Sequence, residues 1–358
     1  MKLPTLLRKE FDWGRHRLGT VAVLLIVLPA AFGVGTLFFQ HTFPENTPIA
    51  VVGVDGATED DVDIVVGAIT ASEFSDPVVY DSSERAFAHL ERERVYAVIE
   101  VPGRLGSTGT TSTVEINVDG RITPYRVPSR ALVAVLANVD EQFSLPGEVT
   151  AERRVIGTTA DLPTYLLPVF LMIFLMLFAF TYVPYNVAKE RRAIDRLRMA
   201  SSVDAMLAAK FVSFVPVVVV ATLVVYAVGT LLGHSLQPLS VPLVGVYLLT
   251  FLYLSAISLA VVLLTDFSTT GRVLNVIILF VLLALSNLVY PAGFFSGWGR
   301  EVSRSMPTHY SMIIARSHML KGGVEPWAFA DWWGWLGGFT LATFVVLKLA
   351  TEWYKRGE

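Results

Sequence analysis

The sequence predicts an α-helical polytopic membrane protein with six transmembrane helices and a small α/β extracytoplasmic domain. Hydrophobic residues occupy 53% of the 358 positions and charged residues only 16%, whereas about a quarter of the residues in a soluble protein are charged. Four long runs contain no Asp, Glu, Lys or Arg: residues 18–44, 162–188, 211–265 and 273–299. Roughly 20 apolar residues in a helix cross the hydrocarbon core, and backbone groups in lipid must be hydrogen-bonded within their own segment. The charge-free runs therefore predict membrane-spanning helices.

Residues 1–17 predict a cytoplasmic amphipathic helix that lies on the membrane surface. Leu3, Leu7 and Phe11 recur at helical spacing among basic residues, and this pattern is typical of interfacial helices. The first transmembrane span follows at residues 18–40. Its apolar run is too long for the core of a signal peptide, so we expect a retained anchor.

Residues 41–161 have a different composition and predict the extracytoplasmic α/β domain. Short β-rich segments alternate with helix-like segments; the expected strands are residues 49–54, 78–81, 95–101 and 114–118, and the expected helices are residues 60–70, 83–93 and 127–143. Residues 41–162 contain 20 acidic and nine basic residues, with no lysine. A well-solvated surface accounts for this charge. A cation-collecting vestibule is the alternative, although no tight carboxylate cluster with calcium-ligand spacing supports it.

Residues 162–350 predict a bundle of five further spans. The uncharged stretch 211–265 is too long for one crossing, and it breaks at the polar, proline-bearing residues 234–242. We expect spans close to residues 163–186, 211–232, 243–264, 273–295 and 333–350. Residues 351–358 are expected to form a cytoplasmic tail.

Basic residues predict the orientation, because cytoplasmic loops carry an excess of Lys and Arg. Residues 1–17 contain five basic residues and the loop 187–210 contains six, whereas the turn at residues 234–242 has none. We therefore expect a multi-pass protein of the plasma membrane with both termini in the cytoplasm.

The sequence lacks the motifs of a catalytic site. It contains no GxxxxGK[ST] phosphate loop, since no Gly precedes a Lys, and it has no HExxH, no GxSxG and no cysteine. No enzyme activity, cofactor or metal is therefore expected in this chain. The spans contain only weakly polar side chains such as Asn275 and Ser258, whereas ion-coupled transporters generally need ionisable residues within the bilayer. A proton or sodium antiporter is accordingly disfavoured.

Three stretches resemble the type-2 ABC exporter permease family. They are the basic start at residues 7–17, the charged segment 187–203 with Lys210, and the segment from Tyr290 to Gly322. In the second stretch Arg192 and Ala193 stand where the family usually has Gly-Thr. Residues 91–102 are similar to part of the insert found in the subgroup with a large domain between spans one and two. The resemblance covers most of the chain in order.

The resemblance implies a permease subunit that moves a hydrophobic or amphipathic solute outward with energy from a separate ATPase. ATP would be bound by that ABC ATPase, and a second permease copy, identical or paralogous, would complete the transporter among membrane lipids, with no role for nucleic acid. The alternative is a non-transporting membrane scaffold or sensor that presents the extracytoplasmic domain.

The resemblance also assigns two functional segments. Loop 187–210 would be the coupling loop that docks the ATPase, through Glu190, Arg191, Arg192, Asp195, Arg196, Arg198 and Lys210. A basic loop that merely obeys the positive-inside rule is the alternative there. Residues 296–330 would form a re-entrant segment near the exit of the transport path, with Pro291, Pro307, Tyr310 and Arg316 as its marked residues. An amphipathic interfacial helix is the alternative for this segment.

Overall fold

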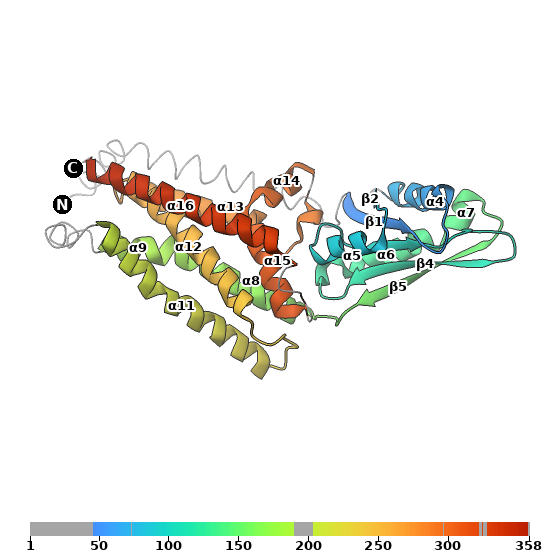
Figure 1. Cartoon of the computed structure of the whole chain (residues 1–358), viewed down its shortest axis with the longest axis horizontal. Coiled ribbons are helices and arrows are strands. Elements are labelled where there is room, and N and C mark those ends of the chain that lie inside the picture. The colour runs from blue at the N-terminus through green and yellow to red at the C-terminus, as the bar shows by residue number, and fades with distance from the viewer. Residues whose placement is uncertain are drawn as a thin grey trace, which may run out of the picture.

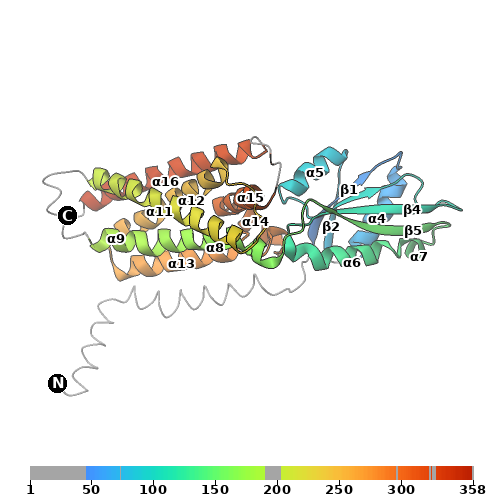
Figure 2. The same cartoon turned by 90° about the horizontal axis from the view of Figure 1, so that it is seen from below.

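The computed structural model describes residues 46–72, 74–189, 203–295, 297–321, 324 and 328–356. In both views the molecule is elongated, with a helical bundle at one end and an α/β domain at the other (Figures 1 and 2). The predicted amphipathic helix and first span, residues 1–17 and 18–40, lie outside the described residues.

The α/β domain is built on a five-stranded mixed sheet with the strand order β2-β1-β3-β4-β5. Its strands are β1 (Thr47–Gly53), β2 (Ser75–Val79), β3 (Val98–Val101), β4 (Thr111–Asp119) and β5 (Glu148–Ile156). Strand β1 is parallel to both neighbours, β4 is antiparallel to β3, and β5 is parallel to β4. The interior strand β1 has a nearly continuous apolar sequence, as expected for a parallel strand that is covered on both faces.

Helices cover both faces of this sheet. Helices α4 (Glu59–Thr70), α6 (Arg126–Leu136) and α7 (Val139–Phe143) pack on the face that carries Ile49 and Val51. Helix α5 (Ser83–Glu91) packs on the opposite face, against Ala50 and Val52. Alternate residues of β1 therefore serve two separate cores, and α5 and α6 lie on opposite sides of the sheet in Figure 2.

The sequence-based strands and helices of this domain are confirmed in outline, but strand β5 was missed. The sequence of β5 is EVTAERRVI, and only Val149 in it is buried. Such a polar edge strand lacks the apolar alternation on which strand prediction depends. The expected helix 127–143 is divided into α6 and α7 near Asn138.

Four helices of the bundle are long and apolar enough to cross a membrane. The first, Leu162–Lys189, consists of α8 (Leu162–Leu177), a π-helical turn η4 (Phe178–Tyr182) and α9 (Val183–Lys189). The others are α11 (Val203–Leu231), α12 (Val241–Leu264) and α16 (Ala330–Arg356). Helix α13 (Thr269–Leu285) is apolar but shorter. The described residues thus provide four candidate spans, and the expected total of six stays a prediction.

The structure corrects two expected boundaries. The predicted fifth span, residues 273–295, is helical only as far as Leu285; the chain then turns through Asn287, whose φ is 56°, into the short 3₁₀ helix η5 (Ala292–Phe294). The predicted sixth span at residues 333–350 is longer than expected. Helix α16 continues to Arg356 and includes most of the segment expected as a tail, with basic residues in its last turn, where they interact favourably with the helix dipole.

Helix α12 lies at the centre of the bundle, and two of its polar side chains, Tyr253 and Ser258, bond to neighbouring helices. The Tyr253 hydroxyl lies 3.1 Å from Ser311 Oγ, and Asn275 Nδ2 donates to Ser258 Oγ at 3.0 Å. Hydrogen bonds of this kind join helices where neither lipid nor an apolar core offers another partner.

The end of the bundle farthest from the α/β domain collects several chain segments. The end of α9, the start of α11, the α12–α13 turn and the end of α16 all lie there (Figure 1). The Asp204 carboxylate at the start of α11 pairs with Lys348 at 2.8 Å and with Lys355 at 2.9 Å, both on α16. These ion pairs fasten α11 to α16 at that end.

Candidate functional site

Two short helices, α14 (Gly297–Ser305) and α15 (Pro307–Leu320), lie where the bundle meets the α/β domain (Figure 1). Most of α15 is buried, and it packs against α8, α12 and α16. Pro307 occupies its first turn, where the missing N–H costs nothing. Helix α15 is therefore an internal element that faces both parts of the molecule.

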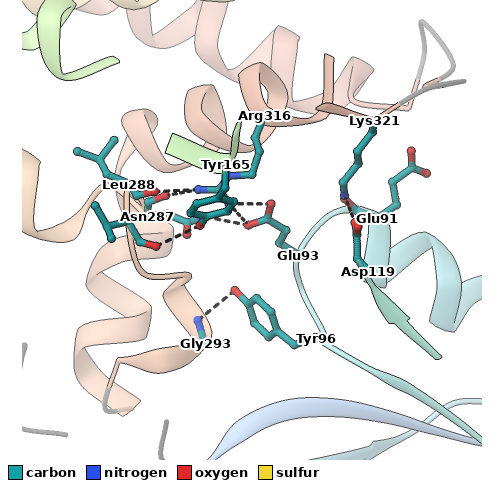
Figure 3. Close-up of polar contacts among 11 residues, drawn as sticks. Glu91, Glu93, Tyr96, Asp119, Tyr165, Asn287, Leu288, Gly293, Arg316 and Lys321 are labelled. Carbon is teal, nitrogen blue, oxygen red and sulfur yellow. Dashed lines mark hydrogen bonds and ion pairs between the residues drawn. The ribbon is translucent and has the colours of Figure 1, made fainter. Parts of the chain in front are cut away.

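The main contact between the two parts is an ion pair between Arg316 of α15 and Glu93 of the α/β domain. The Arg316 Nη1 atom lies 2.8 and 2.7 Å from the two carboxylate oxygens of Glu93. Both side chains are fully buried, with 0% exposure. Figure 3 shows the two side chains pointing toward each other from opposite sides of the junction. We call this the junction pair.

The second terminal nitrogen of Arg316 holds the chain beyond α13, whereas its Nε atom has no hydrogen-bond partner among the described residues. Its Nη2 atom donates to the carbonyl oxygens of Asn287 at 2.8 Å and Leu288 at 3.0 Å. Asn287 Nδ2 in turn donates to Glu93 at 3.2 Å. The two carbonyls bond to Arg316 and not to helical amides. Helix α13 therefore ends before the predicted residue 295.

The ring of Tyr165 on α8 completes the surroundings of the guanidinium. The Arg316 Cζ atom lies 4.7 Å from the centre of this ring, and the Tyr165 hydroxyl donates to Val289 O at 3.1 Å. Burial alone would lower the pKa of Arg316, but the adjacent Glu93 carboxylate raises it above its ordinary value. The side chain is therefore a permanent buried cation.

The backbone around Glu93 is unusual. Glu93 connects α5 to β3 and has a φ of 54°, a left-handed conformation that few residues other than glycine adopt. Its amide donates to Leu90 O at 3.1 Å, which closes the turn after α5. This turn directs the Glu93 carboxylate out of the α/β domain and toward Arg316 (Figure 3).

A second ion pair crosses the same junction. Lys321, at the end of α15, places its Nζ atom 2.9 Å from Asp119 Oδ2 and 2.9 Å from Glu91 O. Asp119 is the last residue of β4, and Arg121 Nε lies 3.2 Å from its other oxygen. Burial by itself would raise the pKa of Asp119, but Lys321 and Arg121 together hold it below its ordinary value.

A third contact joins η5 to the core of the α/β domain. Gly293 N donates to the Tyr96 hydroxyl at 3.1 Å, and Thr47 Oγ1 donates to Gly293 O at 3.4 Å. The Phe294 ring packs beside Tyr96 and Tyr125, with ring centres 6.3 and 6.4 Å away. The chain after α13 is thus inserted between the bundle and the sheet.

The described residues predicted for the re-entrant segment lie at the junction between the bundle and the α/β domain, whereas Lys210 is the one described residue of the predicted docking set. Tyr310 packs on Trp332 and Trp335, with ring centres 5.0 and 4.9 Å away, and Pro291 begins the turn into η5. Lys210 lies on α11, where its Nζ donates to Asn186 at 2.8 Å. The other coupling-loop residues lie outside the described residues: Glu190, Arg191, Arg192, Asp195, Arg196 and Arg198. Among the described residues, no group of three or more His, Asp or Glu side chains could hold a metal ion.

Comparison with protein families identifies this combination of an apolar bundle and an inserted α/β domain. The sequence profile of the ABC-2 family transporter proteins matches residues 19–347 of this chain. The chain belongs to the ABC-2 family of transport permeases. The matched residues include both the bundle and the α/β domain. A comparison with curated protein sequences gives no significant match.

The sequence analysis named Arg316 as a functional residue but did not predict its ion-pair partner Glu93. Arg316 follows the apolar residues Met312 to Ala315, and an arginine within such a run is a signal that it needs a buried partner. Nothing in the sequence near Glu93 or Asp119 distinguishes these residues from the many other acidic side chains of the domain. The pairing therefore emerges only from the structure.

Proposed function

We propose that this chain is the permease subunit of an ATP-binding-cassette exporter, which moves a hydrophobic or amphipathic solute outward with energy from a separate ATPase. The family match over residues 19–347 supports this proposal most directly. The chain itself contains no phosphate loop, so the work of transport must come from a partner that binds ATP. The permease then needs only to offer different affinities for its cargo in two conformations.

In the proposed orientation the α/β domain is extracytoplasmic and both chain termini are cytoplasmic. The end of α9 and the start of α11, which flank the basic loop in the sequence, lie with the end of α16 at the end of the bundle opposite the α/β domain. This arrangement supports the proposed orientation through the positive-inside rule. The proposal includes six spans, a plasma-membrane location and membership of the permease subgroup with a large domain between spans one and two.

The proposed ATPase contact is the coupling loop. Its alternating acidic and basic residues suit docking into a charged groove of a partner, since electrostatic complementarity sets specificity and association rate. In the sequence the loop lies between α9 and α11. Asp204 at the start of α11 is paired with Lys348 and Lys355 of α16, so a movement of the loop would also move α16. No ATP, metal or other cofactor would bind to the permease itself.

A second permease copy, identical or paralogous, completes the proposed transporter. Helix α11 presents an exposed apolar side, which includes Val212, Val220 and Leu231. In the assembled transporter such a surface faces either lipid or the second copy.

The test is purification of the permease from its native membrane, followed by identification and assay of a bound ATPase. The double variants Arg191→Glu/Arg192→Glu and Arg196→Glu/Arg198→Glu should lose the ATPase, because both reverse the charge of the docking surface. The matched control is Arg130→Glu/Arg154→Glu, which reverses two arginines of the α/β domain and should retain the ATPase. If the coupling-loop variants bind the ATPase as tightly as the control does, the docking assignment is wrong. Solute export by the permease without any ATPase would contradict the proposed function as a whole.

A further inference from the structure

A cleft of about 700 Å³ opens beside the junction pair, between the α/β domain and helices α14–α16. The α/β domain contributes the turn from His89 to Val95 and one edge of the sheet. Helices α14 and α15 contribute Arg300, Arg304 and His309, and α16 contributes Trp332. Of the junction pair, Glu93 lines the cleft and Arg316 does not.

The charge of this cleft is opposite to that of the domain that forms half of it. Four arginines line it, namely Arg92, Arg94, Arg300 and Arg304. Three carboxylates also line it, but Glu93 is already committed to Arg316, which leaves Asp76 and Glu301. Arg92 is likewise paired with Asp331 at 3.3 Å, so Arg94, Arg300 and Arg304 remain against these two carboxylates. Arg92 and Arg94 are two of the nine basic residues in the acidic segment 41–162. They line the same cleft as Arg300 and Arg304 of α14.

Arg94 and Arg304 have the greatest capacity for an added ligand. They are neighbours, because Arg304 Nη2 donates to Arg94 O at 3.4 Å. The closest carboxylate contact of Arg304 is a long one, 3.8 Å to Glu301, whose own side chain is 76% exposed. Arg94 is exposed, and within the described part of the chain no carboxylate lies at ion-pair distance from its guanidinium.

The pKa values of the two histidines that line the cleft, His309 and His89, are lowered by burial and by nearby arginines. His309 is 5% exposed, and its Nδ1 atom has no hydrogen-bond partner among the described residues. Burial, followed by Arg304 and Arg316, lowers the pKa of His309 to about 3. Burial, followed by Arg94, Arg85 and Arg92, also lowers the pKa of His89.

Aromatic rings form the wall of the cleft nearest the bundle. Tyr310 meets Trp332 edge-on, with an interplanar angle of 72°, and the guanidinium carbon of Arg92 lies 5.6 Å from the centre of the Trp332 ring. Rings with one apolar and one polar side are typical of membrane–water interfaces. The cleft thus combines a basic wall with an amphipathic aromatic wall.

We propose that this cleft binds the anionic headgroup of an amphiphile, with Arg94 and Arg304 as the anion-binding residues. Guanidinium groups bind phosphate and carboxylate oxygens through paired, charge-assisted hydrogen bonds, and the neutral His309 adds a donor or acceptor at the back of the cleft. The acyl or ring portion of the ligand lies along Tyr310 and Trp332. Binding itself is independent of the proposed function, whereas a role for this ligand as cargo on its way out rests on that function.

The test is calorimetric titration of the full-length permease in detergent, without ATPase or nucleotide, so that a failure here is separate from a failure of the ATPase proposal. The probes are soluble dihexanoyl phosphatidylglycerol, its zwitterionic counterpart dihexanoyl phosphatidylcholine, and inorganic phosphate. We expect the anionic lipid to bind best and Arg94→Gln/Arg304→Gln to weaken it by at least about 10-fold, the magnitude expected for lost hydrogen bonds to a charged group. Arg130→Gln, an exposed arginine on α6 outside the cleft, should bind as the wild type does.

Each other outcome is decisive. If inorganic phosphate binds as tightly as the anionic lipid, the cleft is an anion site whose ligand is a free phosphate and not an amphiphile. If phosphatidylcholine binds equally well, or if Arg94→Gln/Arg304→Gln keeps wild-type affinity while melting at the wild-type temperature, the proposal is overturned. A variant that melts earlier is replaced by Arg94→Lys/Arg304→Lys, which keeps the charge but loses the paired geometry and should bind with intermediate affinity.

Discussion

At the scale of single residues, the junction pair is the most deeply buried ion pair among the described residues. Removing two charges from water is costly, and their mutual attraction repays that cost only when the remaining donors and acceptors are also paired. Arg316 meets this requirement largely through Asn287 and Leu288, so that one side chain holds both Glu93 and the chain after α13. A buried pair of this kind specifies which surfaces meet more than it adds stability.

Loss of one partner of the junction pair should therefore be severely destabilising. Glu93→Gln leaves the Arg316 cation buried without a counter-charge, which costs about 3–5 kcal/mol of folding free energy. The double variant Glu93→Gln/Arg316→Met should recover part of this loss. The comparison is made by thermal unfolding of the purified permease, with Arg85→Gln as the control. Arg85 pairs with Asp81 at the surface, with side chains 67% and 92% exposed, and its loss should cost less than about 1 kcal/mol.

His309 should make stability depend on pH. Its pKa is about 3 in the folded protein and 6.5 in a free side chain, so between these values the unfolded chain binds more protons. Stability should accordingly fall as the pH drops from 6.5, by about 1.4 kcal/mol for each pH unit from this group. The measurement is the free energy of unfolding at pH 7 and at pH 5. Its decrease between these two pH values should be about 2 kcal/mol smaller in His309→Gln than in the wild type. Equal losses in the two proteins would show that His309 is accessible to protons when folded.

The sequence identifies residues of this kind one at a time but not as pairs. Arg316 is conspicuous because it follows an apolar run, whereas Glu93 is one of 20 acidic residues between positions 41 and 162. The two residues are 223 positions apart. Only the packing of α15 between the bundle and the sheet brings them together.

At the scale of elements, the differences between expectation and structure occur where tertiary contacts replace local preference. Hydrophobicity alone extended the fifth span to residue 295, because residues 273–299 carry no charge. The helix ends ten residues earlier than that prediction, since the carbonyls of Asn287 and Leu288 bond to Arg316 and not to helical amides. Strand β5 was missed for the complementary reason, as its pairing with β4 depends on backbone hydrogen bonds and not on an apolar face.

The turn after α13 gives a test with a matched pair of glycines. A Cβ atom at Gly293 would overlap the ring of Tyr96, whereas a Cβ atom at Gly297 would meet nothing within 4 Å. Gly293→Ala should therefore separate η5 from the α/β domain and lower the unfolding temperature. Gly297→Ala should leave it unchanged or slightly raised, because alanine is favoured in a helix. Limited proteolysis near η5 is the second measurement, and equal cleavage in both variants would contradict the inserted position of this turn.

At the scale of the whole molecule, the sequence predicted the permease family and the separation into an apolar bundle and an α/β domain. The family follows from the resemblance of three sequence stretches, and the separation follows from long charge-free runs and a change of composition at residues 41–161. Neither kind of evidence depends on tertiary contacts. The relation between the two parts could not be predicted in this way. It depends on contacts such as those of Arg316, Lys321 and Gly293, whose partners are distant in the sequence.

These contacts predict that the α/β domain moves with α14 and α15 as one unit during transport. Separating them would expose the junction pair and the Lys321–Asp119 pair, which costs several kcal/mol for each uncompensated charge. The chain has no cysteine, so spin labels at Arg85→Cys on α5 and Glu301→Cys on α14 report one distance without further substitution. Both positions are exposed, with side chains 67% and 76% accessible. Pulsed electron paramagnetic resonance should give the same distance distribution with and without the ATP-bound partner, and a broader one in the Glu93→Gln background. A nucleotide-dependent shift larger than the width of the wild-type distribution would show instead that the junction opens during the transport cycle.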